Sequence, residues 1–261
     1  MNTHVISSLA GAAALAVLLL PVASSPAAAQ GRGRAAGPPA GPAPRLPNGT
    51  PDFSGVLMGG GGVSMRALKP GDTLTLLPEA KKLQDSRLAK DDPEANCLPT
   101  GVPRMNPYPW RMVQSIDMKY IFILFEGNIH SYRQIFLDGR AHLSDPDPTW
   151  YGHSIGHWEG DTLVVDTVGF NDKFWFGATG LPHTTRLHTV ERFTRTDANT
   201  MSWDILIDDP GAYAKPFTVQ TRARYEAGWE LMEYICQENE TSAEHIRGLA
   251  NSPSANGAAP Q

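Results

Sequence analysis

Residues 151–168 read YGHSIGHWEGDTLVVDTV, and this stretch decides the fold class. Two runs rich in β-branched and aromatic residues, 152–158 and 162–168, flank the turn signal at 159–161. Short alternating runs of this composition around a tight Gly-containing turn are typical of a β-hairpin. The stretch therefore predicts two antiparallel strands joined by a tight turn.

The hairpin admits two turns, one centred on Gly160-Asp161 and the other on Glu159-Gly160. Moving the turn centre by one residue moves the cross-strand pairing by two, so the side chains keep their faces. His153, His157 and Asp166 lie on one face in both registers. We expect Asp166 to lie diagonal to both histidines with the first turn, and opposite His153 with the second.

Similar runs recur along the chain and predict further strands at 119–126, 129–136, 187–194, 201–207, 217–225 and 230–236. The one good helix candidate is 78–89, where Pro78 suits the first helical position. Strands joined mainly by short turns favour a mainly β fold. We expect a single antiparallel β-barrel or a two-sheet sandwich with one short helix, lipocalin-like by analogy.

The start of the chain has the pattern of a signal peptide over residues 1–29. An uncharged apolar run at 9–23 is short for a membrane span, and small residues at 27–29 fit a cleavage site. Gly and Pro dominate 30–51, which predicts a flexible linker, and 247–261 predicts a disordered tail. The β domain is then 52–246, and the protein is expected to be periplasmic or secreted.

Only two cysteines are present, Cys97 and Cys236. An oxidising compartment favours a disulfide between them, which would tie the start of the domain to its expected final strand. The alternative is a pair of buried free thiols.

The charge pattern bounds the partners. The chain has 22 Lys+Arg against 27 Asp+Glu, a formal net charge of −5, and no basic run. Nucleic acid, and a membrane surface after signal cleavage, are therefore not expected as partners. A small-molecule ligand or substrate is expected, and the composition leaves the oligomeric state open.

Three segments carry a resemblance: HSIGHWEGDTLVVDTVGFND (153–172), EGNIHSYRQIFLDGR (126–140) and IDDPGAYAKPFTV (207–219). On these segments most of residues 50–245 resembles an uncharacterised family of exported bacterial proteins. The resemblance implies export, and it brings with it no activity and no catalytic residue.

His153, His157 and Asp166 are the candidate catalytic residues. An Asp beside an imidazole orients the ring and stabilises its protonated form, which a general base requires. Four residues apart on a strand, the two histidines are about 13 Å apart and do not share one metal ion. We expect no cofactor, while a divalent metal held by histidines stays open if His130, His142, His183 or His188 converges on the hairpin.

Aromatic and histidine side chains flank the hairpin and are the candidate substrate-binding residues, suited to a sugar-like or aromatic molecule. They are Trp150, Tyr151, His130, Tyr132 and Trp175. Arg133 falls on an otherwise apolar face, and we expect it to form an ion pair with Glu126, the alternative being a clamp for a substrate carboxylate.

The functional hypotheses compete. The first is an exported enzyme, a lyase, isomerase or hydrolase, that uses His/Asp acid–base chemistry. The alternatives are a non-catalytic ligand-binding carrier and an exported His-rich metal-site protein. An inward-facing His/Asp face would favour catalysis, and an apolar interior with these residues outside would favour the carrier.

Overall fold

The computed structural model describes residues 40–63, 65–104, 108–127, 131–238, 248 and 250. His130, a predicted substrate-binding residue, lies outside the described residues. So do residues 1–29 and most of 247–261, for which a signal peptide and a disordered tail are predicted.

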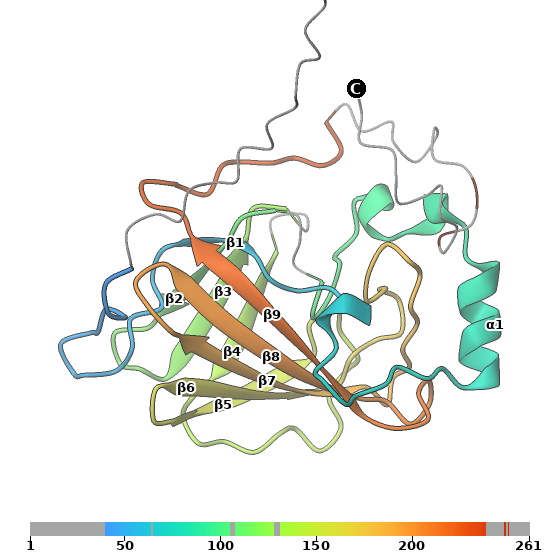
Figure 1. The fold of residues 1–261 in the computed structure, drawn as a ribbon, viewed down its shortest axis with the longest axis horizontal. Helices are drawn as coiled ribbons and strands as arrows, with labels where there is room; N and C mark the ends of the chain where they lie inside the picture. The colour runs from blue at the N-terminus through green and yellow to red at the C-terminus, as the bar shows by residue number, and fades with distance from the viewer. Residues whose placement is uncertain are drawn as a thin grey trace, which may run out of the picture. The chain divides into compact units, whose positions relative to one another are not determined.

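Nine strands of the described residues close into a barrel (Figure 1). They are β1 (Val56–Gly59), β2 (Trp110–Gln114), β3 (Tyr120–Phe125), β4 (Tyr132–Phe136), β5 (His153–Glu159), β6 (Thr162–Val168), β7 (His188–Arg195), β8 (Thr200–Asp208) and β9 (Phe217–Tyr225). The helical segments are α1 (Pro78–Ser86) and three 3₁₀ turns: Met65–Ala67, Ala89–Asp91 and Glu94–Asn96. The prediction of a mainly β barrel with one short helix is confirmed.

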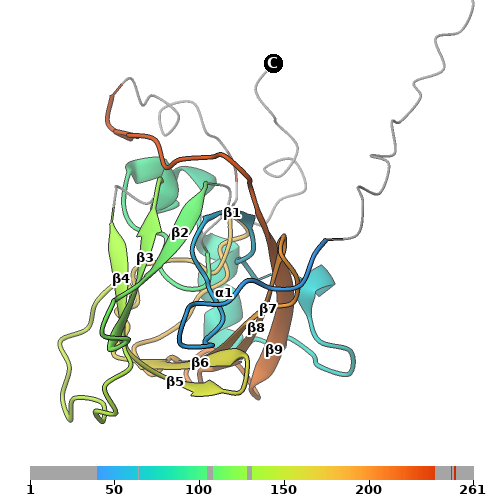
Figure 2. The ribbon, with the colours of Figure 1, turned by 90° about the vertical axis from the view of Figure 1, so that its left-hand side faces the viewer.

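Adjacent strands pair antiparallel around the barrel except for β4 and β5, which are parallel. Parallel neighbours need a long connection that returns to the same end of the sheet, and 137–152 supplies it. Figure 2 looks into the barrel, with β2–β4 on one side, β7–β9 on the other and the β5–β6 hairpin between them. The β4–β5 ladder has only two residue pairs, Ile135↔Ser154 and Phe136↔Ile155. The neighbouring β3–β4 and β5–β6 ladders are longer.

Three differences from the predicted strands stand out. β1 and β2 were not predicted, and their pairing with β9 and β3 completes the closure. The strand predicted at 230–236 is wrong, because those residues form no strand. β9 already pairs with β8 on one edge and β1 on the other, so no edge remains for a further strand.

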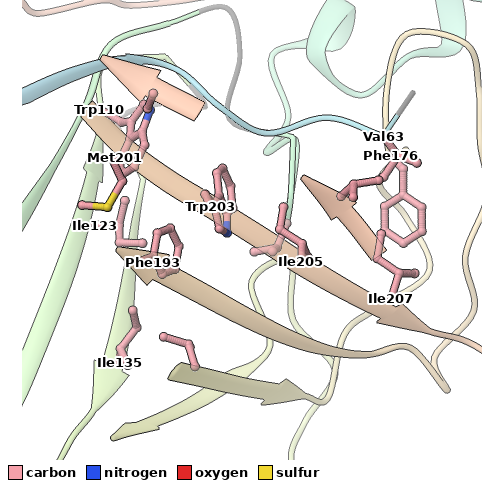
Figure 3. Packing of buried hydrophobic residues seen from close by; sticks show 14 of the residues in the cluster. Val63, Trp110, Ile123, Ile135, Phe176, Phe193, Met201, Trp203, Ile205 and Ile207 are labelled. Carbon is pink, nitrogen blue, oxygen red and sulfur yellow. The ribbon is translucent and has the colours of Figure 1, made fainter. Parts of the chain in front are cut away.

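The barrel interior is filled by large apolar side chains, seen in Figure 3. Inward and outward residues alternate along the strands, as in β8, where every second residue is fully buried. Fully buried residues of the interior include Trp110, Ile123, Ile135, Phe193, Met201 and Trp203. Each such side chain contributes about 1.5–3 kcal/mol by leaving water, so the interior is a packed core.

Segments at both ends of the described chain contact the barrel. Arg45, inside the predicted linker, forms an ion pair with Asp161, and the backbone of Gly41 bonds Ala198. Cys97 and Cys236 form the predicted disulfide, but Cys236 lies in an irregular segment after β9. Among the described residues, none of the helices has both the length and the apolar character needed to cross a bilayer.

Candidate functional site

The β5–β6 hairpin adopts the Gly160-Asp161 turn. Glu159 pairs with Thr162, and Ile155 lies opposite Asp166. Gly160 has φ +59°, a left-handed conformation that glycine adopts without strain. His153, His157 and Asp166 share one face of the hairpin as predicted. The structure turns this face outward, while Ser154 points inward and is fully buried.

Asp166 lies at the centre of a cluster of imidazoles, but its partners are not the predicted ones. His142 Nε2 and His188 Nε2 both lie 2.9 Å from the same carboxylate oxygen, Oδ1. His188 is at the start of β7, diagonal to Asp166 across the β6–β7 pair. His142 comes from the 137–152 connection, which therefore covers part of the outer face of β5 and β6.

His153 joins the cluster through His142. Their Nδ1 atoms are 2.9 Å apart, and their rings meet nearly edge to face. The other neighbour of the His153 ring is Phe136, stacked at a centroid distance of 5.3 Å, with the Arg140 guanidinium 3.9 Å from the Phe136 ring centroid. These contacts fix the plane of the His153 imidazole.

The geometry assigns the protons. An ionised carboxylate only accepts hydrogen bonds, so His142 Nε2 and His188 Nε2 carry hydrogens that they donate to Asp166. When His142 is neutral its Nδ1 is then an acceptor, and His153 Nδ1–H donates to it. The remaining nitrogen of His153, Nε2, carries a lone pair and hydrogen-bonds no described residue.

Partial burial lowers the pKa of His153, and the nearby His142 and Arg140 lower it further. His153 is therefore neutral near pH 7, the form in which Nε2 accepts a proton. His142, Asp166 and His188 are 21%, 39% and 37% exposed at their side chains, so the cluster is half-buried.

His157 lies outside this cluster. Its side chain is 64% exposed, and Nε2 lies 3.2 Å from Glu159 Oε1 on its own strand. Glu159 in turn accepts from Arg192. His157 shares a face with Asp166 but has the environment of a surface residue.

A cavity of about 410 Å³ adjoins His153 at the splayed seam between β4 and β5. Its walls come from most of β4, from the start of β5 and from the connection between them. The lining residues are Tyr132, Arg133, Gln134, Phe136, Leu143, Pro146, Asp147, Thr149, Tyr151, Gly152, His153 and Ser154. This volume is in the range of small-molecule sites.

Two of the predicted substrate-binding aromatics, Tyr132 and Tyr151, line this cavity. Tyr151 stacks on Phe125, and its hydroxyl lies 2.5 Å from Ser131 Oγ. Burial raises the pKa of the Tyr151 phenol to about 12, so it stays protonated. Trp150 and Trp175 are not among the lining residues; Trp150 packs against the core, and Trp175 is buried beneath Arg87.

Arg133 has a different partner from the predicted Glu126. Its guanidinium forms a two-point ion pair with Glu191, a fully buried residue of β7. It also donates to Ser154 Oγ at 3.0 Å and to Thr167 Oγ1 at 2.7 Å. Glu126 instead accepts the backbone N–H of Met232. The prediction was wrong because Arg133 points into the barrel, where β7 supplies the carboxylate.

The outward direction of the His/Asp face would by itself favour the carrier hypothesis. The interior that a carrier would use is, however, filled by the core, and the open volume lies at the seam instead. His142 and the rest of the 137–152 connection half-bury the outer face. The His/Asp face is therefore neither interior nor open to solvent, the two cases that the strand pattern suggested.

No group of three or more His, Cys, Asp or Glu side chains within the described ranges has the geometry to hold a metal ion. His142 and His188 do converge on the hairpin, but they meet at one oxygen of Asp166 as hydrogen-bond donors.

The fold and the cluster define a β-barrel protein with a half-buried His/Asp site beside a cleft. Comparison with protein-family models, curated proteins and solved structures finds no match to this chain.

Proposed function

We propose that this protein is an exported enzyme that performs acid–base chemistry on a small molecule bound in the cleft between β4 and β5. The observation that supports it most is the directed chain from Asp166 through His142 to His153, a residue of the cavity wall whose Nε2 hydrogen-bonds no described residue. A general base must lie within reach of a bound substrate and be neutral at the working pH.

Proton transfer follows the hydrogen bonds. When His153 Nε2 takes a proton from the substrate, its Nδ1 proton passes to His142 Nδ1. The positive charge then forms on His142, directly against the Asp166 carboxylate. Asp166 thus stabilises a charge two rings away from the substrate, and the reverse transfer makes the same chain a general acid.

The cleft supports a sugar-like or aromatic substrate. The rings of Tyr132 and Tyr151 offer stacking surface, and Thr149 and Asp147 offer polar groups. A lyase, an isomerase and a hydrolase can each use a positioned proton acceptor and donor of this kind. We propose no organic cofactor, and a divalent metal held by histidines stays the alternative. The partner is a small molecule, with no nucleic acid or membrane involved.

A periplasmic or secreted location is part of the proposal. The pattern of residues 1–29 and the Cys97–Cys236 disulfide both fit an oxidising compartment outside the cytoplasm. On the three quoted segments we also propose membership of the uncharacterised exported family.

The test is turnover of a panel of aryl glycosides and aromatic esters by wild type and variants. Asp166→Asn and His153→Gln should each lower kcat by about 10²–10⁴-fold while circular dichroism stays unchanged. His157→Gln, an exposed histidine of the same strand, is the matched control and should keep wild-type rates. Equal rates in all four proteins would refute the proposal. Binding without turnover across the panel would favour the carrier alternative.

A further inference from the structure

The cleft reaches the backbone of β4 as well as its outward side chains. Tyr132, Arg133 and Gln134 are consecutive, yet all three line the same cavity. Successive side chains of a strand point to opposite faces, so a cavity that lies against one face contacts every second residue. Tyr132, Gln134 and Phe136 share the outward face of β4, so the cavity follows that face, and it also reaches the backbone of Arg133 between them.

The burial of the lining residues agrees with this. Arg133 and Ser154 are 1% and 0% exposed, and their side chains are engaged inside the barrel with Glu191 and Thr167. They therefore contribute backbone to the cavity wall, while their side chains belong to the core.

The pairing pattern identifies the backbone groups that face the cavity. Phe125 N–H donates to Ser131 C=O, and Leu137 N–H donates to Lys119 C=O, at the two ends of the β3–β4 pair. In an antiparallel pair alternate residues exchange both bonds, so Tyr132 points its N–H and C=O away from β3. The ladder to β5 begins only at Ile135↔Ser154, beyond Tyr132. Within the described chain, the Tyr132 backbone thus lies at an open strand edge.

We propose that the cleft binds an extended peptide segment that pairs with this open edge of β4. An unpaired strand edge is a template for a further strand, and main-chain hydrogen bonds supply the affinity in such complexes. Four residues of β4 line the cavity, and the part before the Ile135↔Ser154 pair, Tyr132–Gln134, matches a segment of about three residues at ~3.3 Å per residue. An aromatic side chain of the segment packs against Tyr132 and Tyr151, and its backbone passes His153.

This inference rests on the proposed function, because it names the substrate class of the same cleft. A sugar-like ligand has hydroxyl groups at varied angles, whereas Tyr132 presents one donor and one acceptor side by side. That pair matches a secondary amide chain. The substrate class thereby narrows to peptides, or peptide-like amides, that carry an aromatic group.

The probes are blocked tripeptides, acetyl-Ala-Phe-Ala-amide and its Tyr and Trp analogues, each also made with one backbone amide at a time N-methylated. Phenyl glucoside is the non-peptide control. Binding is measured by calorimetry, and hydrogen exchange of the Tyr132 amide is followed by NMR in the full chain. Binding is also measured in His153→Gln, which lacks the proposed general base. A peptide that binds this variant without being turned over supports the peptide site independently of the proposed catalysis.

We expect at least one tripeptide to slow exchange at Tyr132 in both wild type and His153→Gln. N-methylation at one position should weaken binding by about tenfold or more, because it removes the hydrogen bond to the Tyr132 carbonyl and leaves that group unpaired. The inference is overturned if no tripeptide protects Tyr132 at millimolar concentration, or if all methylated forms bind as well as the parent. Protection by phenyl glucoside alone would overturn it while leaving the proposed function intact.

Discussion

Asp166 uses a single oxygen, Oδ1, for two imidazole donors, and this sharing sets the proton arrangement of the cluster. Because His142 donates through Nε2, it is free to accept through Nδ1, and His153 is held as its donor. If Asp166 bonded His153 directly, the positive charge of the protonated imidazole would stay on His153, at the cavity wall. The intervening ring moves that charge to His142, beside the Asp166 carboxylate.

His183 is a second histidine whose surroundings decide its charge. It lies between Phe174 and Phe176, at ring distances of 3.8 and 5.0 Å. Burial lowers its pKa to about 4 from an ordinary 6.5. The residue is 3% exposed and therefore folds as a neutral ring.

This burial makes stability depend on pH between about 6.5 and 4. In that window the unfolded chain binds a proton at His183 that the folded chain does not, so the free energy of unfolding falls as the pH falls. The loss amounts to about 3 kcal/mol by pH 4, at about 1.4 kcal/mol per pKa unit. Urea unfolding of wild type and His183→Gln at several pH values measures it, since the carboxylates common to both proteins cancel. Parallel stability curves for the two proteins would count against this origin.

At the scale of strands, β4–β5 and β1–β2 are the two shortest ladders of the barrel, and a buried brace crosses the β4–β5 seam. The β4–β5 ladder spans two residue pairs, whereas β7–β8 spans eight. Arg133 of β4 bonds Ser154 of β5, Thr167 of β6 and Glu191 of β7. The network therefore joins four strands behind the cleft. It holds β4 and β5 together beyond their first residues, where the two strands are not paired.

Removing one partner of this brace should destabilise the fold strongly. Glu191→Gln leaves the buried Arg133 charge unpaired, and a loss of about 3–5 kcal/mol in the free energy of unfolding is expected. Replacing both partners, as in Arg133→Met with Glu191→Leu, should recover most of this loss, since the charges leave together. Arg192→Gln, which removes an exposed pair with Glu159, is the control and should change stability little. Chemical denaturation measures all of these, and a Glu191→Gln variant as stable as the control would contradict the role of the brace.

The strand pattern predicted the elements with strong alternation and missed those without it. Seven predicted strands match β3 to β9 closely, and the hairpin turn was one of two considered. β1 was missed because it is four residues long and ends at Gly59. The segment 230–236 has apolar and aromatic residues like a strand but is held by other contacts, among them Met232 N–H to Glu126 and the disulfide.

The site was predicted only in part, for a related reason. His153 and Asp166 come from the hairpin, where register is readable from the sequence. His142 comes from an irregular connection, and no periodicity places such a residue. His188 lies on the outward face of β7, and only the β6–β7 register brings it diagonal to Asp166.

At the scale of the whole chain, the disulfide joins the segment after β9 to the segment between the 3₁₀ turn Glu94–Asn96 and β2. Cys97 and Cys236 are 139 residues apart in sequence. Near this link Tyr234 packs on Tyr108, and Met232 bonds Glu126 at the end of β3. The bridge therefore closes a loop that contains β2 to β9.

Loss of the disulfide should lower stability without removing the barrel. Closing a loop of this length stabilises the fold by about 5 kcal/mol in the chain-entropy model. Replacing both cysteines by serine, or reducing the bridge, should lower the free energy of unfolding by up to that amount in guanidinium titrations. The β-type circular dichroism should persist, because the strands pair independently of the bridge. A double variant with wild-type stability would contradict this assignment.

The arrangement of protons in the histidine cluster tests the central claim most directly, and it needs no substrate. Long-range ¹H–¹⁵N NMR at neutral pH reports which nitrogen of each imidazole carries the hydrogen. We predict neutral His142 with the proton on Nε2, and neutral His153 with the proton on Nδ1 and a bare Nε2. Asp166→Asn should disturb this pattern, while His157→Gln should leave it unchanged. A proton on His153 Nε2 in the resting protein, as the other tautomer or as imidazolium, would contradict the account.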